Sequence, residues 1–571
     1  RERIAAARSL RAVFAPSSIA VIGASRTRGT IGRAILDNVI ADGFTGAIYP
    51  VNPNAHELAG RACYPSVTAI GASVDLAIIT VPSAAVEAVM SECAGCGVRA
   101  VVVISAGFAE VSAHGRASEH RLRTIARAAG MRMVGPNCMG VLSTAPGTRL
   151  NATFSPVSPP AGNVSMATQS GALGLAMLDH ARDRGLGIAE FASIGNKADV
   201  SVNDLLSYWH DDPRTRVIAL YLESFGNPRT FARLAPAISR DRPIIAVKSG
   251  RSTAGSRAAS SHSAALASLD IGIDAVFAQT GVIRTDTLEQ MFDVAALLSS
   301  QPVPAGARVG VVTNAGGPGI LLADACESHG LTLPTLAPET IAALRALLPT
   351  QAGLANPIDM IASASAEQFE AAIGLVGRDP HVDAVVAIYV PVLVTQSEDI
   401  AGGIARGAAA VPLDKPIAAV FMSSKGAPAL LSSGARGVIP SYRYPENAAL
   451  SLALAARYGA WRRRPAGVQL TLLAEQSQRV RARVRSWRAA HPRACWLPFD
   501  EIAALLAIIG VRVAAHRTTP ADPDAAVAAA QALGYPVVIK AVAAGLLHKT
   551  DVGGVALDLA DAPAVRAAAD A

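Results

Sequence analysis

The sequence predicts an α/β protein of several domains, and three observations lead to this fold class. From residue 17 onward, short apolar segments rich in Val and Ile alternate with stretches of helix length, the pattern of parallel sheets covered by helices on both faces. The alternation restarts near Val164 and again near Arg308. With 571 residues, the chain is also too long for a single hydrophobic core. We therefore expect successive doubly wound domains.

Composition narrows the classes of function. Hydrophobic residues make up 51% of the chain and charged residues 17%, which is typical of a globular protein and excludes a disordered one. The net charge of +7 comes mostly from scattered arginines, and only 4% of the residues are aromatic, too few for base stacking. We expect no nucleic-acid partner, because anionic cofactors account better for a mildly basic chain.

The cysteines and the apolar runs bear on location and metal binding. The six cysteines have no regular spacing, so we expect no disulfide framework and a cytoplasmic location. The Cys93–Cys96 motif has no second pair, and we expect no metal site from it. No uncharged apolar run reaches 18 residues, so no membrane partner is expected.

The first predicted domain spans residues 10–147. Its expected strands are Ile19–Ile22, Ala47–Val51, Asp75–Val81, Ala100–Ile104 and Met131–Val134. The first strand runs into a glycine-rich turn from Gly23 to Gly32, whose backbone N–H groups and helix end would hold a phosphate. Ser25 stands where a dinucleotide fingerprint has its second glycine, and Asn52 stands where NAD enzymes have a carboxylate, so NAD is disfavoured. A plain tight turn is the alternative.

Further turns follow other strands of this domain. They are Thr80–Ser83, Ser105–Glu110 and Gly135–Gly140, and each lies at the carboxyl end of an expected strand. Open parallel sheets bind ligands at the carboxyl ends of their strands, so together these turns predict a binding crevice.

The second and third predicted domains span residues 148–302 and 303–464. Their expected strands are Val164–Thr168, Ala189–Ala192, Val217–Leu222 and Pro243–Lys248, then Arg308–Thr313, Ala384–Val390 and Pro416–Met422, with a closing helix Pro445–Arg462. In each, the first strand leads through a small-residue turn into a helix, at Ser170–Gly171 and at Ala315–Gly319. Such corners bind phosphate, although each alone is equally well a plain strand-to-helix turn.

His262 is the candidate nucleophile. It follows the strand ending at Lys248 and lies among small residues that would let a phosphoryl group reach its ring. Imidazole is a competent nucleophile near neutral pH, and a carboxylate on the other ring nitrogen would raise its basicity. Glu223, at the end of the strand Val217–Leu222, is the candidate for that carboxylate. The alternative is a structural histidine, the commoner role of a lone one.

A linker and a fourth unit close the chain. Residues 465–492 are expected to form a linker with a solvated amphipathic helix, and residues 493–571 a further α/β unit. Within that unit, Asp500–Val511 predicts a helix running into a strand. The remaining expected elements are a helix at Asp524–Leu533 and strands at Pro536–Lys540 and Gly554–Leu557.

In kind and in order, these motifs resemble the NDP-forming acyl-CoA synthetases, the family of succinyl-CoA synthetase and the ADP-forming acetate–CoA ligases. The resemblance runs from about residue 10 to residue 571. It implies a Rossmann-like CoA-binding domain, two flavodoxin-like ligase domains and the start of an ATP-grasp domain. The expected cofactor-binding residues are Gly23, Ser25, Gly32, Asn52, Pro53, Val81, Ser105, Asn137, Ser170, Gly171 and Lys540.

The resemblance also implies a reaction. Acyl-CoA and phosphate give acyl phosphate and CoA, the phosphoryl group moves to His262, and ADP then receives it. By the same resemblance Glu223 steadies His262, Ser170 and Gly171 receive the phosphate, and His548 relays it. The implied cofactors are CoA or acyl-CoA, ADP or ATP, phosphate and Mg²⁺, with the magnesium ligands expected beyond residue 571.

Two departures leave an alternative function open. Ser263 and Ala264 stand where the family has Thr-Gly, and only the first part of an ATP-grasp domain is expected within residue 571. Relatives fused to a GNAT-type acetyltransferase serve as acyl-CoA sensors for protein lysine acetylation, and the charged start at Arg1 would suit such a linker. Because sensors often lose the histidine, His262 favours an acid–CoA ligase acting on a small carboxylic acid and CoA, expected as a homo-oligomer.

Overall fold

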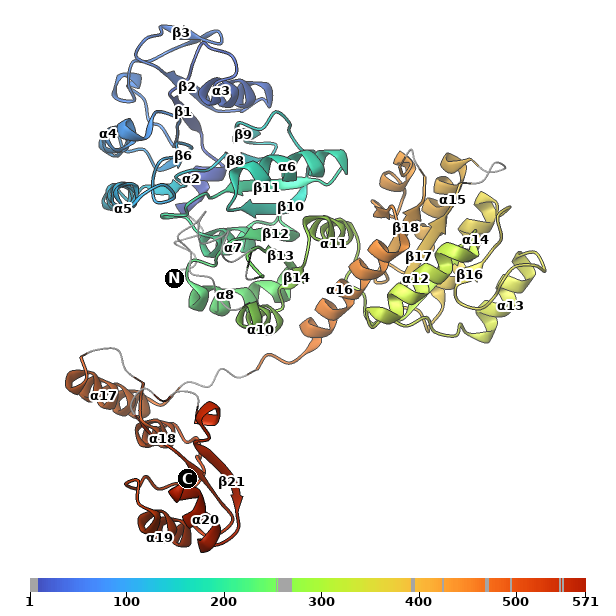
Figure 1. Cartoon of the computed structure of the whole chain (residues 1–571). Coiled ribbons are helices and arrows are strands. Elements are labelled where there is room, and N and C mark those ends of the chain that lie inside the picture. The colour runs from blue at the N-terminus through green and yellow to red at the C-terminus, as the bar shows by residue number, and fades with distance from the viewer. Residues whose placement is uncertain are drawn as a thin grey trace. The chain divides into compact units, whose positions relative to one another are not determined.

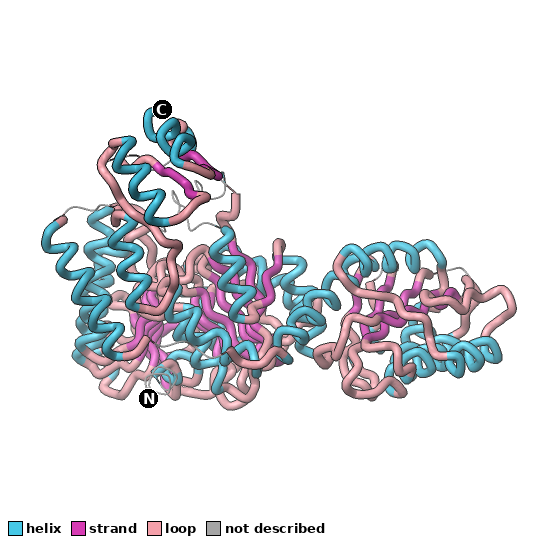
Figure 2. Tube along the Cα trace, turned by 90° about the horizontal axis from the view of Figure 1, so that it is seen from below, coloured by secondary structure: helices cyan, strands magenta, loops and turns pink. Residues whose placement is uncertain are grey.

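The computed structural model describes residues 9–252, 254, 270–391, 396–423, 426–467, 472–492, 496–543, 546 and 549–571. The chain divides into two compact units, Arg1–Pro465 and Ala466–Ala571. Both units contain helices and strands (Figure 1). In the first unit, helices lie on both sides of the strands, as the alternating pattern predicts (Figure 2).

The first sheet is parallel and has the order β2-β1-β5-β6-β7. Its strands are β1 (Ser18–Ile22), β2 (Ala47–Val51), β5 (Leu76–Ile79), β6 (Ala100–Val103) and β7 (Arg132–Val134). The surrounding elements are helices α2 (Arg11–Phe14), α3 (Ile31–Ala41), α4 (Ser83–Gly95) and α5 (Ala113–Ala128), the short helix η1 (Thr68–Ile70) and the hairpin β3 (Glu57–Leu58) and β4 (Arg61–Ala62). Strands β1, β5 and β6 are buried throughout, since helices cover both faces of the sheet.

The second sheet has the order β14-β13-β12-β10-β11-β8-β9. Its strands are β8 (Gly140–Ser143), β9 (Leu150–Thr153), β10 (Ala161–Thr168), β11 (Ile188–Ser193), β12 (Val217–Leu222), β13 (Ile244–Lys248) and β14 (Ile283–Thr285). The helices are α6 (Gly171–Asp183), α7 (Val202–Asp211), α8 (Pro228–Asp241), α10 (Asp270–Thr280) and α11 (Leu288–Ser300). The hairpin of β8 and β9 was not expected; β8 pairs antiparallel with β11, so the predicted boundary at residue 147 falls between two strands of this sheet.

The third sheet is parallel and has the order β16-β15-β17-β18-β19. Its strands are β15 (Val309–Thr313), β16 (Ile358–Asp359), β17 (Ala384–Tyr389), β18 (Ile417–Phe421) and β19 (Ser441–Tyr442). The helices are α12 (Gly316–Ser328), α13 (Pro338–Leu347), α14 (Ala366–Arg378), α15 (Ser397–Ala409), the short η2 (Ala429–Ser432) and α16 (Pro445–Arg463). Helix α16 also touches the second domain, because Tyr458 Oη donates to the carbonyl oxygen of Ser239 at 2.6 Å.

All three sheets share one topology. Numbered along the chain within each sheet, the five parallel strands lie in the order 2-1-3-4-5, with the β8–β9 hairpin added at one edge of the second sheet. The connections reverse direction between the first and third strands, and ligands bind at the carboxyl ends of the strands at such a switch point. The glycine-rich turns predicted from the sequence follow the first strand of each sheet, directly at this position.

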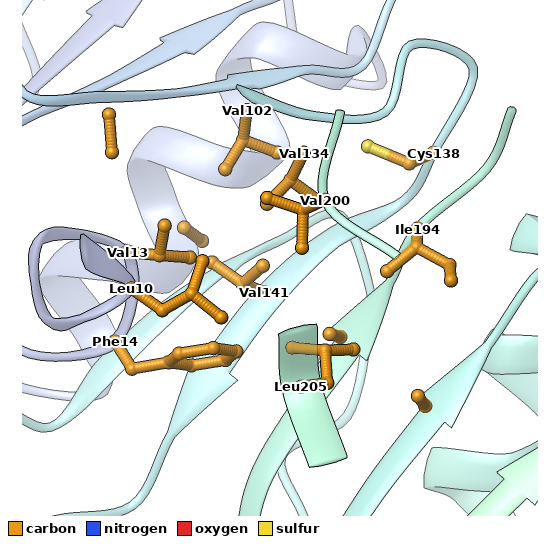
Figure 3. Close-up of a cluster of buried hydrophobic side chains, with 14 of the residues drawn as sticks. Leu10, Val13, Phe14, Val102, Val134, Cys138, Val141, Ile194, Val200 and Leu205 are labelled. Atoms are coloured by element: carbon orange, nitrogen blue, oxygen red, sulfur yellow. The ribbon is translucent and has the colours of Figure 1, made fainter. Parts of the chain in front are cut away.

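The first two domains share a hydrophobic core. One cluster of buried side chains includes residues of α2, of the first sheet and of the second domain. Figure 3 shows the side chains that meet in it, among them Phe14, Val102, Val134, Ile194 and Leu205. A close-packed apolar interface of this kind holds the two domains in one arrangement. Loops contributed by both domains therefore keep fixed positions relative to one another.

The second unit, Ala466–Ala571, is the smaller of the two. Its elements are α17 (Ala474–Ala490), α18 (Phe499–Ile508), α19 (Pro523–Leu533), β20 (Val537–Lys540), η3 (Lys549–Val552), β21 (Val555–Leu559) and α20 (Ala562–Asp570). Helix α17 has no buried residue, in line with the solvated linker helix predicted there. The strand expected at the end of Asp500–Val511 is wrong, because α18 ends at Ile508 and residues 511–520 form no strand. Across the described ranges of both units, no helix is long and apolar enough to cross a membrane.

Candidate active site

A pocket of about 680 Å³ lies between loops of the first two domains. Its wall combines the turns that follow β5, β6 and β7 with the start of α6. Five residues predicted for cofactor binding line it: Val81, Ser105, Asn137, Ser170 and Gly171. The pocket therefore joins the carboxyl edge of the first sheet, where a ligand is expected, to a helix N-terminus that favours anions.

The glycine-rich turn after β1 brings α3 close to the sheet. Gly23 has a φ of +90°, and a Cβ there would lie 2.5 Å from Thr80 Oγ1. A Cβ on Gly32 would lie 2.1 Å from the carbonyl oxygen of Gly23. Real Cβ atoms do not come so close to other heavy atoms, so only glycine fits at both positions. Helix α3 can then begin directly over the ends of β1 and β5.

Three other predicted CoA residues belong to loops at this edge of the sheet. Ser25 Oγ accepts a hydrogen bond from the backbone N–H of Thr27 at 3.1 Å. The Asn52 amide donates to the carbonyl oxygen of Ala24 at 2.7 Å, and Pro53 is exposed beside it. Ser25 and Asn52 therefore shape the turn, and none of the three is among the residues that line the pocket.

The first turn of α6 forms one wall of the pocket. Ser170 is the N-cap residue, and its Oγ accepts a hydrogen bond from the backbone N–H of Leu173 at 3.4 Å. The Thr168 hydroxyl fixes the turn, since it accepts from the Ser170 N–H at 3.1 Å and donates to the Ser170 carbonyl at 2.9 Å. The remaining N–H groups of the first turn and the positive helix end attract an anion.

Replacing Ser170 by alanine should loosen this helix end. Loss of an N-cap hydrogen bond costs about 1 kcal/mol, which corresponds to roughly fivefold faster opening of the first turn. Hydrogen–deuterium exchange of the amides of residues 172–175 measures this opening. In contrast, Ser91→Ala, on α4, should leave the exchange of α6 unchanged, because the Ser91 hydroxyl bonds only within its own helix. Unchanged exchange in the Ser170 variant would contradict the capping role.

Gln169 ties the start of α6 to the end of β12. Its Oε1 accepts from the backbone N–H groups of Glu223 and Ser224, each at 2.9 Å. Its Nε2 donates to the Ser224 carbonyl oxygen at 2.6 Å, and the side chain is buried. The third domain repeats this contact, because Asn314 bonds in the same two-sided way to the backbone of Val390 after β17. In both domains, therefore, a side-chain amide after the first strand of the sheet forms hydrogen bonds to the backbone after the third strand, across the switch point.

Glu223 lies beside two lysines. The ammonium group of Lys197 lies 3.4 Å from Gln169 Oε1. Burial lowers the pKa of Lys197, the carboxylates of Glu223 and Glu119 oppose that shift, and Lys248 adds to it. Lys248 is buried at the end of β13 and donates to the carbonyl oxygen of Ser249. Opposite charges thus gather at the carboxyl ends of β12 and β13, next to the start of α6.

A loop of the second domain docks on the first domain behind the pocket. The backbone N–H of Asn196 donates to the carbonyl oxygen of Pro136 at 3.0 Å, and the Asn196 amide donates to Glu110 and Glu119 at 2.6 and 2.8 Å. Burial raises the pKa of Glu119, whereas hydrogen bonds from Asn196 and from backbone amides outweigh burial and lower the pKa of Glu110. Asn137, which lines the pocket, donates to Asn196 Oδ1 at 3.3 Å.

The structure leaves some predicted residues apart from this site or undescribed. His262 and His548 lie outside the described residues. Lys540 is the last residue of β20 in the second unit, where it pairs with Val555 and is exposed. Sequence reasoning missed Gln169, whose role depends on packing, and it missed Lys197 and Lys248. The rarity of lysine could have pointed to these two residues, since the chain has six lysines and 45 arginines.

Metal ligands are not assembled in the part of the chain that the structure describes. Among those residues, no group of three or more His, Cys, Asp or Glu side chains could hold a metal ion. The described residues of the second unit therefore do not by themselves provide the ligands of a magnesium site.

The cysteines of the Cys93–Cys96 motif differ in exposure. Cys93 is buried in α4, where burial raises the pKa of its thiol to about 12, and Cys96 is exposed.

Four family models match the chain along its length. A CoA binding domain matches residues 17–144, and a succinyl-CoA ligase like flavodoxin domain matches residues 161–298. A ligase-CoA domain matches residues 309–466, and an ATP-grasp domain matches residues 488–571. These matches agree with the α/β fold class and with the kinds of domain that the sequence predicts.

Curated relatives match between three quarters of the chain and nearly all of it. The acetate–CoA ligase [ADP-forming] I of Archaeoglobus fulgidus is 35% identical over 556 residues, which are 96% of this chain and 78% of that protein. The 4-hydroxybutyrate–CoA ligase [ADP-forming] of Nitrosopumilus maritimus is 32% identical over 96% of this chain and 78% of its own length. The alpha subunit of acetate–CoA ligase [ADP-forming] II of Pyrococcus furiosus is 41% identical over 442 residues, 95% of that subunit and 76% of this chain.

A solved structure has the same fold. The dinucleotide forming acetyl-coenzyme A synthetase 1 of Ca. Korarchaeum cryptofilum, in complex with phosphate and ADP, superimposes with a TM-score of 0.73 at 37% identity. The match covers 79% of this chain and 97% of that one. None of these relatives is named as an acetyltransferase or as a sensor, so the regulatory alternative has no support from them.

Proposed function

The chain belongs to the family of ADP-forming acid–CoA ligases, and on that premise we propose how its own residues carry out the ligase reaction. The reaction interconverts acyl-CoA, ADP and phosphate with a carboxylic acid, ATP and CoA. The small-molecule partners are therefore a carboxylic acid and CoA. We also propose that the enzyme is a homo-oligomer and that it acts in the cytoplasm, where CoA and nucleotides are available.

One observation carries the proposal. The pocket of about 680 Å³ places the turns after β5, β6 and β7 opposite the N-terminus of α6. CoA bound at the carboxyl edge of the first sheet would bring its thioester to a place where the amides of α6 attract phosphate. Acyl-CoA and phosphate, the two reactants of the first step, would then meet in one pocket.

The first step forms acyl phosphate. A phosphate oxygen attacks the thioester carbonyl carbon, the C–S bond breaks, and CoA leaves as a thiolate that takes up a proton. The N–H groups at the start of α6, next to Ser170 and Gly171, stabilise the negative charge that gathers there. In the second step, a ring nitrogen of His262 attacks the phosphorus atom and the carboxylic acid leaves as its carboxylate.

Each predicted residue receives a role in this scheme. Glu223 orients His262 and supports the charge on its ring, as a carboxylate partner does for a catalytic histidine. Val81, Ser105 and Asn137 contact acyl-CoA from the wall of the pocket. The remaining residues, Gly23, Ser25, Gly32, Asn52 and Pro53, build the turns that bind CoA beside it.

Each domain has a separate role in the proposed reaction. Residues 10–147 bind CoA, residues 148–302 carry His262, and residues 303–464 form the second flavodoxin-like ligase domain. Residues 465–492 link these to the part of the ATP-grasp domain at residues 493–571. There Lys540 contacts the nucleotide phosphates and His548 relays the phosphoryl group to ADP, with Mg²⁺ as the metal typical of ATP-grasp domains.

Labelling of the protein tests the proposal without nucleotide. The full chain is incubated with ³²P-phosphate and a panel of acyl-CoAs that starts with acetyl-CoA. We expect a label that acid removes and base does not, as for phosphohistidine. His262→Ala should remove this label completely, because the variant has no ring nitrogen to receive the phosphoryl group.

His120→Ala is the matched control. His120 is exposed on α5, and its label should equal that of the unchanged protein. If the unchanged protein stays unlabelled with every acyl-CoA, or if His262→Ala is labelled as strongly as the control, the proposed mechanism is wrong.

A further inference from the structure

Two of the six lysines of the chain lie together beside the candidate active site. Lys197 and Lys248 are the only lysines among the first 400 residues of the sequence. The chain has 45 arginines but only six lysines, and the ammonium group of lysine is a compact point charge, whereas the guanidinium group of arginine is planar. These two lie near enough for Lys248 to shift the pKa of Lys197.

The backbone holds Lys197 in an uncommon conformation. Its φ is +51°, in the left-handed region that residues other than glycine rarely adopt. The loop around it is fixed from both sides, because Asn196 N–H donates to Pro136 and Ala198 N–H donates to Gly135, at 3.0 and 3.1 Å. A side chain at Gly195 would collide with the carbonyl oxygen of Asn137 at 2.2 Å. The docked loop therefore aims the Lys197 side chain at the start of α6.

The ammonium of Lys197 is held only weakly where it lies. Within the described residues, the hydrogen bond to Gln169 Oε1 is its one recorded polar contact, and at 3.4 Å it is long. That oxygen already accepts two shorter bonds from backbone N–H groups. A half-buried cation with one weak partner gains from a nearby anion. Gln169 itself lines the pocket, so the ammonium is one hydrogen bond away from the pocket wall.

We propose that Lys197 is a phosphate-binding residue of this enzyme, which donates from its ammonium group to a phosphate or phosphoryl oxygen at the N-terminus of α6. The inference rests on the proposed function and adds a cation to the pocket, whose lining among the described residues includes no lysine and no arginine. Lys248, buried at the end of β13, adds positive potential behind it. Glu223 balances this charge when no phosphate is bound.

Arsenolysis of acyl-CoA isolates the step in which Lys197 would act. Arsenate replaces phosphate as the attacking oxyanion, and the acyl arsenate that forms hydrolyses in water, so CoA is released continuously without nucleotide and without His262. The rate of CoA release from the full chain is measured with a thiol reagent while arsenate and acyl-CoA are varied separately. This gives KM for arsenate, KM for acyl-CoA and kcat.

In the Lys197→Met variant, KM for arsenate should rise by about 100-fold, while KM for acyl-CoA should change by less than about twofold. Methionine keeps the length and the packing of the side chain but cannot hold an oxyanion. Lys197→Ala should show the same defect, and added methylamine should lower its KM for arsenate again. A merely structural role would change thermal unfolding and would not respond to the amine.

Lys415→Met is the matched control. Lys415 lies in the third domain, burial lowers the pKa of its ammonium too, and it bonds to the Asp379 carbonyl oxygen at 2.7 Å. Its arsenolysis constants should equal those of the unchanged protein. If arsenolysis occurs but Lys197→Met has an unchanged KM for arsenate, the inference fails and the proposed function stands. If the unchanged protein releases no CoA with any acyl-CoA, the proposed function itself fails.

Discussion

Gly32→Ala is expected to lower the affinity for CoA by 100-fold or more and to destabilise the first domain by about 3 kcal/mol. The added Cβ would lie 2.1 Å from the carbonyl oxygen of Gly23 and 2.9 Å from Thr80 Oγ1. Both the helix and the turn are packed, so α3 has to move away from the ends of β1 and β5. Isothermal titration with CoA and thermal unfolding measure the two effects.

Gly95→Ala is the control variant, which shows the effect of changing a glycine to alanine where the added Cβ meets no other atom. Gly95 lies in α4, its φ is not positive, and a Cβ there meets no atom within 4 Å. Alanine favours a helix over glycine by about 1 kcal/mol, so this variant should keep CoA affinity and unfold at the same or a slightly higher temperature. Normal CoA binding by Gly32→Ala would mean that CoA is not held at this edge of the sheet.

Buried strands were predictable because their signal is local. Ala47–Val51 and Val217–Leu222 form strands with the bounds that the sequence predicts, since a short apolar run bounded by turns is typical of a buried strand. The hairpin of β8 and β9 was missed because its two strands have only four residues each, and because β8 joins the sheet by pairing antiparallel with β11, which is distant in sequence. The strand expected after α18 failed for the opposite reason, because a suitable run finds no partner there.

The candidate site was predictable only in part. Glycines and serines at the ends of strands indicate a phosphate-binding loop, and Ser170 and Gly171 line the pocket. Gln169 and Lys197 give no such signal, because their roles depend on loops more than 25 residues apart that meet only after folding. The packing of these loops in the second domain therefore decides which lysines lie near Glu223.

Glu223→Gln should slow the labelling of His262 by about 100- to 10,000-fold and leave arsenolysis running. A carboxylate that orients a histidine and stabilises its charged form acts only in the step where the ring attacks, and loss of general-base support costs that much. The glutamine keeps the shape of Glu223 but not its charge. Quenched-flow labelling with ³²P-phosphate and acyl-CoA gives the rate of the second step.

The same variant should shift phosphate binding in the direction opposite to Lys197→Met. Removing the carboxylate next to Lys197 takes away a competing anion, so KM for arsenate should fall. Glu289 is an exposed carboxylate on α11, and the Glu289→Gln variant should change neither the rate of His262 labelling nor the rate of arsenolysis. A Glu223→Gln variant that loses arsenolysis and labelling equally would place Glu223 in the first step instead. Opposite responses of the two variants would assign the cation to phosphate binding and the carboxylate to histidine activation.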